Sequence, residues 1–360
     1  MRSRCAIVFI AIVLAFFWTG RMSPRPSDTS SNRWHVASNP EVISQDIQFV
    51  NGDTHLAGTV YLPKNGARLP GVVVLHHAGA ATRDSGLYRH LREGLPTMGF
   101  AVLIYDRRGS GRSGGELQKV DYETLADDAI AGQHALAKLS RIDSSRIGFW
   151  GLSQGGWLAV LAAGRSPDAA FAVSVSAPLV TAAEQMEFAT GNLLTVRGYP
   201  QSDVREMLET RRAWMGYLHG TNSRDAAAEA LRKAESKPWF DLVYLPRASQ
   251  LPSDPEHDAS RRRLDDDPFA AVLRAQAPLL FIYGDSDPWV PVEKSVARLQ
   301  SLSQRQPNIE YAVIANADHE MMTPGNETMQ ADAETTRNKA PQTPAYFMVL
   351  GSWLSRRVAK

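Results

Sequence analysis

The chain has very little cysteine and almost no net charge, and both absences narrow its function. Only Cys5 is a cysteine among 360 residues, so an intrachain disulfide cannot form. No cluster of cysteine and histidine has the spacing of a zinc site. The 39 Lys and Arg residues nearly balance the 38 Asp and Glu residues, which leaves a formal charge of +1. We therefore expect no nucleic-acid partner recruited by bulk positive charge.

The first twenty residues differ from the remainder of the chain. Arg2 and Arg4 precede an apolar run over residues 5–18, which is the pattern of an export signal. This run is shorter than the ~20 apolar residues that cross a bilayer. We expect residues 1–20 to be a cleaved signal peptide of a periplasmic or secreted protein. A retained membrane anchor is the first alternative, and a cytosolic protein is the second. Residues 21–40 are rich in Ser, Pro and Asn and indicate a linker.

After the linker, short apolar runs alternate with segments of helical periodicity. The apolar content of 44% indicates a folded chain, and the length allows one α/β domain with an insertion. Strands are predicted at residues 43–50, 55–62, 72–75, 100–105, 146–150, 171–175, 279–283 and 309–314. Helices are predicted at residues 87–98, 122–139, 155–164 and 346–357. This alternation predicts a mostly parallel sheet that is flanked by helices, with an antiparallel hairpin first.

The alternation stops over residues 180–272, which are helical in composition and lack buried-strand signals. We therefore expect an inserted helical segment that divides an α/β core into residues 41–179 and 273–360. Trp214 and Trp239 are expected to lie in the core of the insertion, although its aromatic residues also favour an apolar substrate group.

A candidate nucleophile lies in the stretch Gly151-Leu152-Ser153-Gln154-Gly155, between a predicted strand and a predicted helix. A serine on such a tight strand-to-helix turn projects its hydroxyl above the edge of the sheet. The turn is cramped, and glycine fills the positions two before and two after the serine. The helix that follows favours negative charge at its N-terminus. The pattern predicts that Ser153 is a nucleophile.

A serine hydroxyl needs a general base, and the base needs an orienting carboxylate. His319 follows the last predicted strand, where a base belongs in a chain with this kind of turn. Asp285 and Asp287 follow the preceding strand, and Asp318 adjoins the histidine. Adjacent side chains usually diverge, so Asp318 is the weakest candidate. From the residues alone, either Asp285 or Asp287 could be the orienting carboxylate.

Acyl transfer also needs two backbone N–H groups that stabilise an oxyanion. Gln154, directly after the nucleophile, is expected to supply one of them. The loop His76-His77-Ala78-Gly79-Ala80 has small residues that let its backbone approach a substrate. We expect Ala78 to supply the second N–H group, with His77 as the alternative. His76 is expected to support the loop.

The glycine-rich loop Asp106-Arg107-Arg108-Gly109-Ser110-Gly111-Arg112-Ser113 has two interpretations. Phosphate binding would require a P-loop lysine or a G-x-G-x-x-G spacing that leads into a helix, and neither is present. We therefore expect a tight turn that is held by salt bridges of Asp106 and Arg107.

Together these motifs resemble the α/β-hydrolase superfamily, in particular its branch of serine aminopeptidase-like hydrolases, dienelactone hydrolase-like proteins and acyl esterases. The resemblance runs from about residue 43 to the C-terminus, outside the insertion. It rests on the 76–79 loop, the 106–113 turn, the 151–155 turn, Gly284-x-x-Asp287 and His319. The resemblance implies an α/β-hydrolase fold and a Ser153–Asp287–His319 triad. One departure is His76-His77, where many relatives have His-Gly.

The resemblance also implies a reaction: acyl transfer to water from a small-molecule acyl substrate, with no metal or cofactor. A carboxylic-ester hydrolase is the leading expectation. A serine exopeptidase for short peptides is the alternative, and Glu184, Glu187, Asp241 and Asp254 are its candidate anchors for a peptide amino terminus. The remaining hypotheses are hydrolysis of a thioester, an amide or a lactone, and a binding protein without catalytic activity. The insertion occupies the position of the family's cap, which covers the active site and selects substrates.

Overall fold

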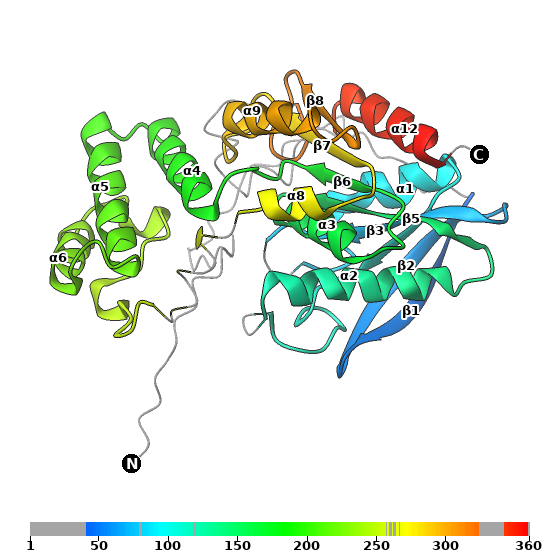
Figure 1. The fold of residues 1–360 in the computed structure, drawn as a ribbon, viewed down its shortest axis with the longest axis horizontal. Helices are drawn as coiled ribbons and strands as arrows, with labels where there is room; N and C mark the ends of the chain where they lie inside the picture. Colours follow the sequence, from blue (N-terminus) through cyan, green and yellow to red (C-terminus); the bar gives the residue numbers. More distant parts are fainter. Residues whose placement is uncertain are drawn as a thin grey trace, which may run out of the picture.

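One eight-stranded sheet, with the strand order β1-β2-β4-β3-β5-β6-β7-β8, runs through the centre of the molecule (Figure 1). The computed structural model describes residues 41–78, 81–117, 120–256, 258, 261, 264–265, 267–323 and 342–358. The strands are β1 (Val42–Asn51), β2 (Thr54–Pro63), β3 (Leu69–Leu75), β4 (Ala101–Tyr105), β5 (Ile142–Leu152), β6 (Ala172–Val175), β7 (Leu279–Gly284) and β8 (Ile309–Ile314). The β1–β2 and β2–β4 pairs are antiparallel and the other pairs are parallel, which confirms the predicted architecture.

The continuous apolar runs form strands that are buried on both faces. Every residue of β3, β4, β6 and β7 is buried. On β3, Val73 and Leu75 pack into one layer of the core, whereas Val72 and Val74 pack into the other. Successive side chains of a strand point to opposite faces, so a strand that is covered on both sides needs apolar residues at every position.

Among the described residues, more helices pack on one face of the sheet than on the other. Four helices pack into one apolar layer: α2 (Tyr122–Ala137), α3 (Gln154–Arg165), α8 (Phe269–Arg274) and α9 (Val292–Ser303). Two helices pack into the other layer: α1 (Arg89–Thr97) and α12 (Pro344–Val358). The sheet therefore lies between two helical layers.

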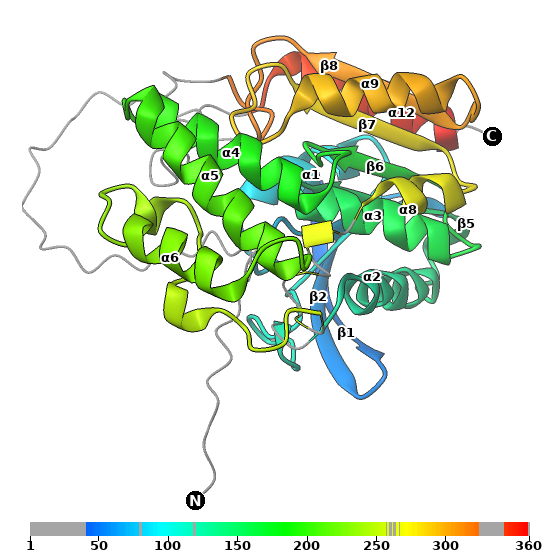
Figure 2. The same ribbon diagram turned by 60° about the vertical axis from the view of Figure 1, so that its left-hand side comes forward.

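Between β6 and β7, three helices that are longer than α8 form a separate apolar cluster: α4 (Ala182–Val196), α5 (Gln201–Leu218) and α6 (Arg224–Ala234). Figure 1 shows α4 between α5 and the sheet, and Figure 2 shows the same cluster from a second side. Trp214 and Trp239 are 2% and 0% exposed, so they belong to the core of this cluster as expected. The short helix α8 packs against α3, alongside the sheet.

Residues 1–20 and 21–40, for which we predict a signal peptide or anchor and a linker, lie outside the described residues. Within the part of the chain that the structure describes, none of the helices combines the length and the apolar character that a membrane crossing requires.

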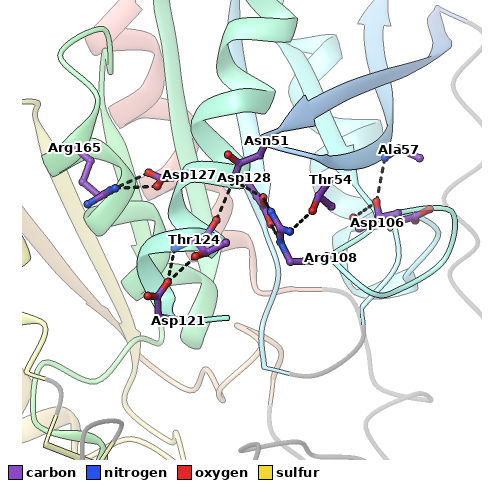
Figure 3. Close-up of polar contacts among 11 residues, drawn as sticks. Asn51, Thr54, Ala57, Asp106, Arg108, Asp121, Thr124, Asp127, Asp128 and Arg165 are labelled. Atoms are coloured by element: carbon purple, nitrogen blue, oxygen red, sulfur yellow. Dashed lines mark hydrogen bonds and ion pairs between the residues drawn. The ribbon is translucent and has the colours of Figure 1, made fainter. Parts of the chain in front are cut away.

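A buried ion pair joins three segments beside the sheet (Figure 3). The Arg108 guanidinium donates from Nε to Asp128 Oδ2 over 2.9 Å and from Nη2 to Oδ1 over 2.5 Å. Asn51, at the end of β1, donates to the same Oδ1 over 2.7 Å, and Thr54 accepts from Arg108. The pair thus connects the β1–β2 hairpin, the 106–113 turn and α2, and its side chains are at most 7% exposed.

Two neighbouring aspartates of α2 allow a matched test of this pair. Asp128→Ala leaves the Arg108 charge buried without its partner, and we expect a loss of about 3–5 kcal/mol in the free energy of unfolding. Asp127 forms an ion pair with Arg165 in which both side chains are 38% exposed. Asp127→Ala should therefore cost less than about 1 kcal/mol, because solvent screens that pair. Urea denaturation measures both losses, and equal losses would contradict the assignment.

Candidate active site

The candidate site residues all follow the carboxyl ends of parallel strands, at one edge of the sheet. His76, His77 and Ala78 follow β3, and Ser153 follows β5. Asp287 follows β7, and His319 follows β8. Ligands of open α/β sheets bind outside this edge, in the crevice where neighbouring connections leave in opposite directions.

Ser153 lies on a turn that has no room for larger neighbours. Its backbone has φ +56° and ψ −123°, a strained conformation for a residue with a side chain. A Cβ on Gly151 would lie 1.9 Å from the carbonyl oxygen of Gly155, and a Cβ on Gly155 would lie 2.3 Å from the carbonyl oxygen of Leu75. Both contacts are far below van der Waals distance. Glycine at these two positions is therefore a steric requirement of the turn, as the sequence pattern predicts.

His319 and Asp287 are bonded to each other. His319 Nδ1 lies 2.8 Å from Asp287 Oδ2, and the two side chains are 18% and 0% exposed. Asp287 Oδ1 accepts the backbone N–H groups of Trp289 and Val290 over 2.8 and 3.1 Å. The carboxylate is thus oriented from both sides. Because Nδ1 donates to a carboxylate, the free Nε2 of a neutral His319 is a proton acceptor.

The two competing carboxylates have other partners. Asp285 Oδ1 accepts the Asn316 N–H over 2.9 Å, so this residue shapes the turn. Asp318 Oδ1 accepts the N–H groups of Glu320 and Met322, each over 2.9 Å, and organises the loop that carries His319. The geometry therefore brings Asp287, and neither of these two residues, to His319 Nδ1.

Helix α4 holds the loop that carries Asp287. Gln185 donates to the Trp289 carbonyl over 3.0 Å, and Asn192 donates to the Pro288 carbonyl over 2.9 Å. These bonds connect the inserted helical cluster to the candidate site.

The loop after β3 offers the Ala78 amide as a candidate donor. The His77 N–H donates to the Tyr88 hydroxyl over 3.0 Å, which excludes it as a free donor. The amides of Ala78 and Gln154 have no acceptor among the described residues. Gly79 and Ala80, the remainder of this loop, lie outside the described residues. The arrangement fits two available N–H donors, at Ala78 and Gln154.

His76 and Arg107 make hydrogen bonds that support this loop. The buried His76 ring bonds to the Tyr105 carbonyl, in the supporting role that was expected of it. Arg107 is 5% exposed and donates from Nη1 to the His77 carbonyl over 2.7 Å and from Nη2 to Gln154 Oε1. Our prediction of a salt bridge within the turn misses these two contacts. No local sequence pattern signals these contacts, because they depend on β4 lying beside β3.

Asp106 does form the predicted turn. Its carboxylate accepts the backbone N–H groups of Arg83 and Arg112 over 2.9 and 2.8 Å. The Arg83 guanidinium lies 3.7 Å from the same carboxylate. A Cβ on Gly111 would lie 2.5 Å from the Asp106 side chain, so the turn has no room for a side chain at this position.

The histidines of the site have opposite electrostatic environments. Burial acts to lower the pKa of His319, but the charge of Asp287 and its hydrogen bond outweigh burial and raise the pKa above 6.5. Burial, together with the nearby charge of Arg107, lowers the pKa of His77 to about 4. Burial lowers the pKa of His76 to about 3. At neutral pH, His76 and His77 are therefore uncharged, whereas Asp287 favours the charged form of His319.

Metal-ligating side chains do not gather in the described part of the chain. Among the residues that the structure describes, no group of three or more histidine, cysteine, aspartate or glutamate side chains could hold a metal ion. The candidate residues supply a hydroxyl, an imidazole, a carboxylate and two amides.

Comparison with known proteins identifies the family. The family described as alpha/beta hydrolase fold matches residues 71–324, which is more than half of the chain. The chain belongs to the alpha/beta hydrolase family. The match includes every candidate site residue from His76 to His319, and membership supports a hydrolase.

The chain shares low sequence identity with several relatives. The quorum-quenching protein AidA of Acinetobacter baumannii is 25% identical over 256 residues, which cover 68% of this chain and 79% of that protein. Among solved structures, an esterase of Pyrococcus furiosus aligns with a TM-score of 0.57 at 19% identity, covering 94% of this chain and 99% of that one. A proline iminopeptidase of Mycobacterium smegmatis aligns with a TM-score of 0.52 at 19% identity, covering 87% and 98%. These structures share the fold.

The His319 environment gives a prediction that does not depend on activity. In Asp287→Asn the attraction that raises the His319 pKa is lost, while burial still lowers it. The pKa of His319 should therefore fall relative to the wild type, as followed by NMR titration of the imidazole protons. Asp285→Asn is the matched control and should leave the His319 pKa unchanged. An unchanged pKa in Asp287→Asn would refute the assigned contact.

Proposed function

We propose that the protein is a serine hydrolase that cleaves carboxylic esters through an acyl-enzyme on Ser153. The observation that carries the proposal is the bond between His319 Nδ1 and Asp287 Oδ2, at the same sheet edge as the strained Ser153 turn. A nucleophile, an orienting carboxylate and a base, in this chain order, are the requirements of acyl transfer on this fold.

In the proposed mechanism, Ser153 Oγ attacks the ester carbonyl carbon while His319 Nε2 takes the hydroxyl proton. The Ala78 and Gln154 amides stabilise the resulting oxyanion. Collapse of the tetrahedral intermediate breaks the ester C–O bond, and His319 returns the proton to the departing alcohol. Water then attacks the acyl-enzyme with His319 as base, which releases the acid and regenerates Ser153. Asp287 orients the ring and stabilises its charged form throughout.

The exopeptidase reading finds less support in the inserted helical cluster. Glu184 forms a capping box with Thr181, Glu187 lies 3.9 Å from Arg212, and Asp241 lies 2.8 Å from Arg247. These three carboxylates already have partners within the cluster, and Asp254, the fourth candidate anchor for a peptide amino terminus, also has a partner. We therefore favour an ester over a peptide substrate.

A paired substrate panel tests this proposal. Purified protein should hydrolyse p-nitrophenyl acetate, butyrate and octanoate, and it should not hydrolyse alanine or proline p-nitroanilides. Ser153→Ala should lower kcat/KM by at least about 10³-fold, because the acyl-enzyme can no longer form. Ser286→Ala, a hydroxyl deletion in the neighbouring loop, serves as the control and should retain activity. Turnover of the anilides without the esters would replace this proposal with the exopeptidase, and full activity of Ser153→Ala would remove the nucleophile assignment.

Phe188 on α4 supports an apolar acyl group. It lies three residues after Gln185 and four before Asn192, on the helix face that bonds to the Asp287 loop. Its side chain is nevertheless 39% exposed. An exposed aromatic ring on this face supports a cap role for α4, in which the ring contacts the acyl chain of a substrate.

Removing this ring should change chain-length preference. Phe188→Ala is expected to lower kcat/KM for p-nitrophenyl octanoate by about 5- to 50-fold, since a buried aromatic contact contributes roughly 1–2 kcal/mol. The value for the acetate should hardly change. Phe347→Ala on α12 is the matched control, because Phe347 has the same 39% exposure on a helix of the core. Equal losses for the two esters would contradict the contact.

A further inference from the structure

Arg107 binds the peptide group that contains one of the two proposed oxyanion donors. The carbonyl of His77 and the N–H of Ala78 belong to the same trans peptide unit, so they point in opposite directions. Arg107 Nη1 donates to that carbonyl oxygen over 2.7 Å. Fixing the carbonyl therefore fixes the direction of the Ala78 N–H. A positive charge at the oxygen also polarises the unit and makes the N–H a stronger donor.

The other arm of the same guanidinium reaches the second proposed donor residue. Arg107 Nη2 donates to Gln154 Oε1, and Gln154 Nε2 lies 3.4 Å from the Tyr122 hydroxyl. The Gln154 side chain is thus held between the 106–113 turn and α2. Its backbone N–H, at the first position of α3, has no acceptor among the described residues.

The guanidinium itself is anchored independently of any substrate. Its side chain is 5% exposed, and its own backbone N–H donates to the Ala81 carbonyl over 3.0 Å. A planar guanidinium can serve two acceptors at a fixed separation, which an ammonium group cannot. Arg107 is separated from His77 by 30 residues and from Gln154 by 47, so it joins two distant segments of the chain.

We propose that Arg107 is a positioning residue of the oxyanion hole, which sets the spacing and direction of the Ala78 and Gln154 amides through its two arms. This inference rests on the proposed function and deepens it. Arg107 acts through the two backbone donors, which must already point at the developing oxyanion when the transition state forms.

Arg107→Met and Arg107→Lys test the inference, with Arg108→Lys as the matched control. Arg108 adjoins Arg107 and is equally buried, but its guanidinium binds Asp128 and Thr54, away from the proposed donors. Three quantities are measured for each folded variant: kcat/KM for p-nitrophenyl butyrate, its pH profile, and the inhibition constant of phenylboronic acid. The boronate forms a tetrahedral adduct on a serine and so reports on the oxyanion hole.

Arg107→Met should lower kcat/KM about 10- to 100-fold, somewhat less than the ~10²–10³-fold loss caused by deleting an oxyanion donor. Phenylboronic acid should bind more weakly by the same factor. Arg107→Lys should fall between Arg107→Met and the wild type. The acidic limb of the pH profile should not move, because the His319–Asp287 pair is untouched. Arg108→Lys should lower the melting temperature and leave kcat/KM and boronate affinity within about two-fold of wild type.

Two results overturn the inference in distinguishable ways. If the wild type turns over the butyrate and binds phenylboronic acid, but Arg107→Met and Arg107→Lys match Arg108→Lys, Arg107 has only a structural role. If the wild type itself neither hydrolyses the ester nor binds the boronate, the proposed function and the positioning role both fail. Should Arg107→Met not fold, Arg107→Lys alone decides between a graded catalytic loss and none.

Discussion

The close backbone contact around the Ser153 turn is the constraint on which the rest of the site depends. No Cβ fits at Gly151 against the Gly155 carbonyl, or at Gly155 against the Leu75 carbonyl. The end of β5, the start of α3 and the end of β3 therefore meet with no side chain between them. This contact gives Ser153 its strained φ of +56° and brings the Gln154 amide next to the loop that carries Ala78.

A second close approach completes the same edge of the sheet. A Cβ on Gly284, at the end of β7, would lie 2.2 Å from the Ala317 carbonyl, two residues before His319. The loops that carry Asp287 and His319 therefore lie close together. This backbone packing allows the 2.8 Å contact between His319 Nδ1 and Asp287 Oδ2. Around this frame, polar side chains connect the loops to neighbouring helices. Arg108 and Asp128 bind the 106–113 turn to α2, and Gln185 and Asn192 bind the Asp287 loop to α4.

Sequence patterns predict the fold and the residues of the site better than the contacts between them. Apolar runs and the Ser153 turn are local signals, so the parallel sheet and the glycine requirement could be predicted. β5 begins at Ile142, earlier than the predicted residue 146, because polar Asp143 is held there by Arg68 and Arg146. The local sequence pattern could not decide whether Asp285 or Asp287 orients the histidine. Only the fold reveals that the Asn316 N–H donates to Asp285. The Arg107 contacts span 30 and 47 residues and depend on β4 lying beside β3, which no local pattern encodes.

The claim that Ser153 is the nucleophile is tested most directly by covalent labelling. A fluorophosphonate probe is incubated with the wild type and with His319→Ala, and the modified peptide is identified by mass spectrometry. The account predicts one adduct on Ser153 in the wild type, and labelling slower by at least about 10²-fold in His319→Ala, because the serine has then lost its base. An unlabelled Ser153 in folded wild-type protein, or equal labelling of the two proteins, would contradict it.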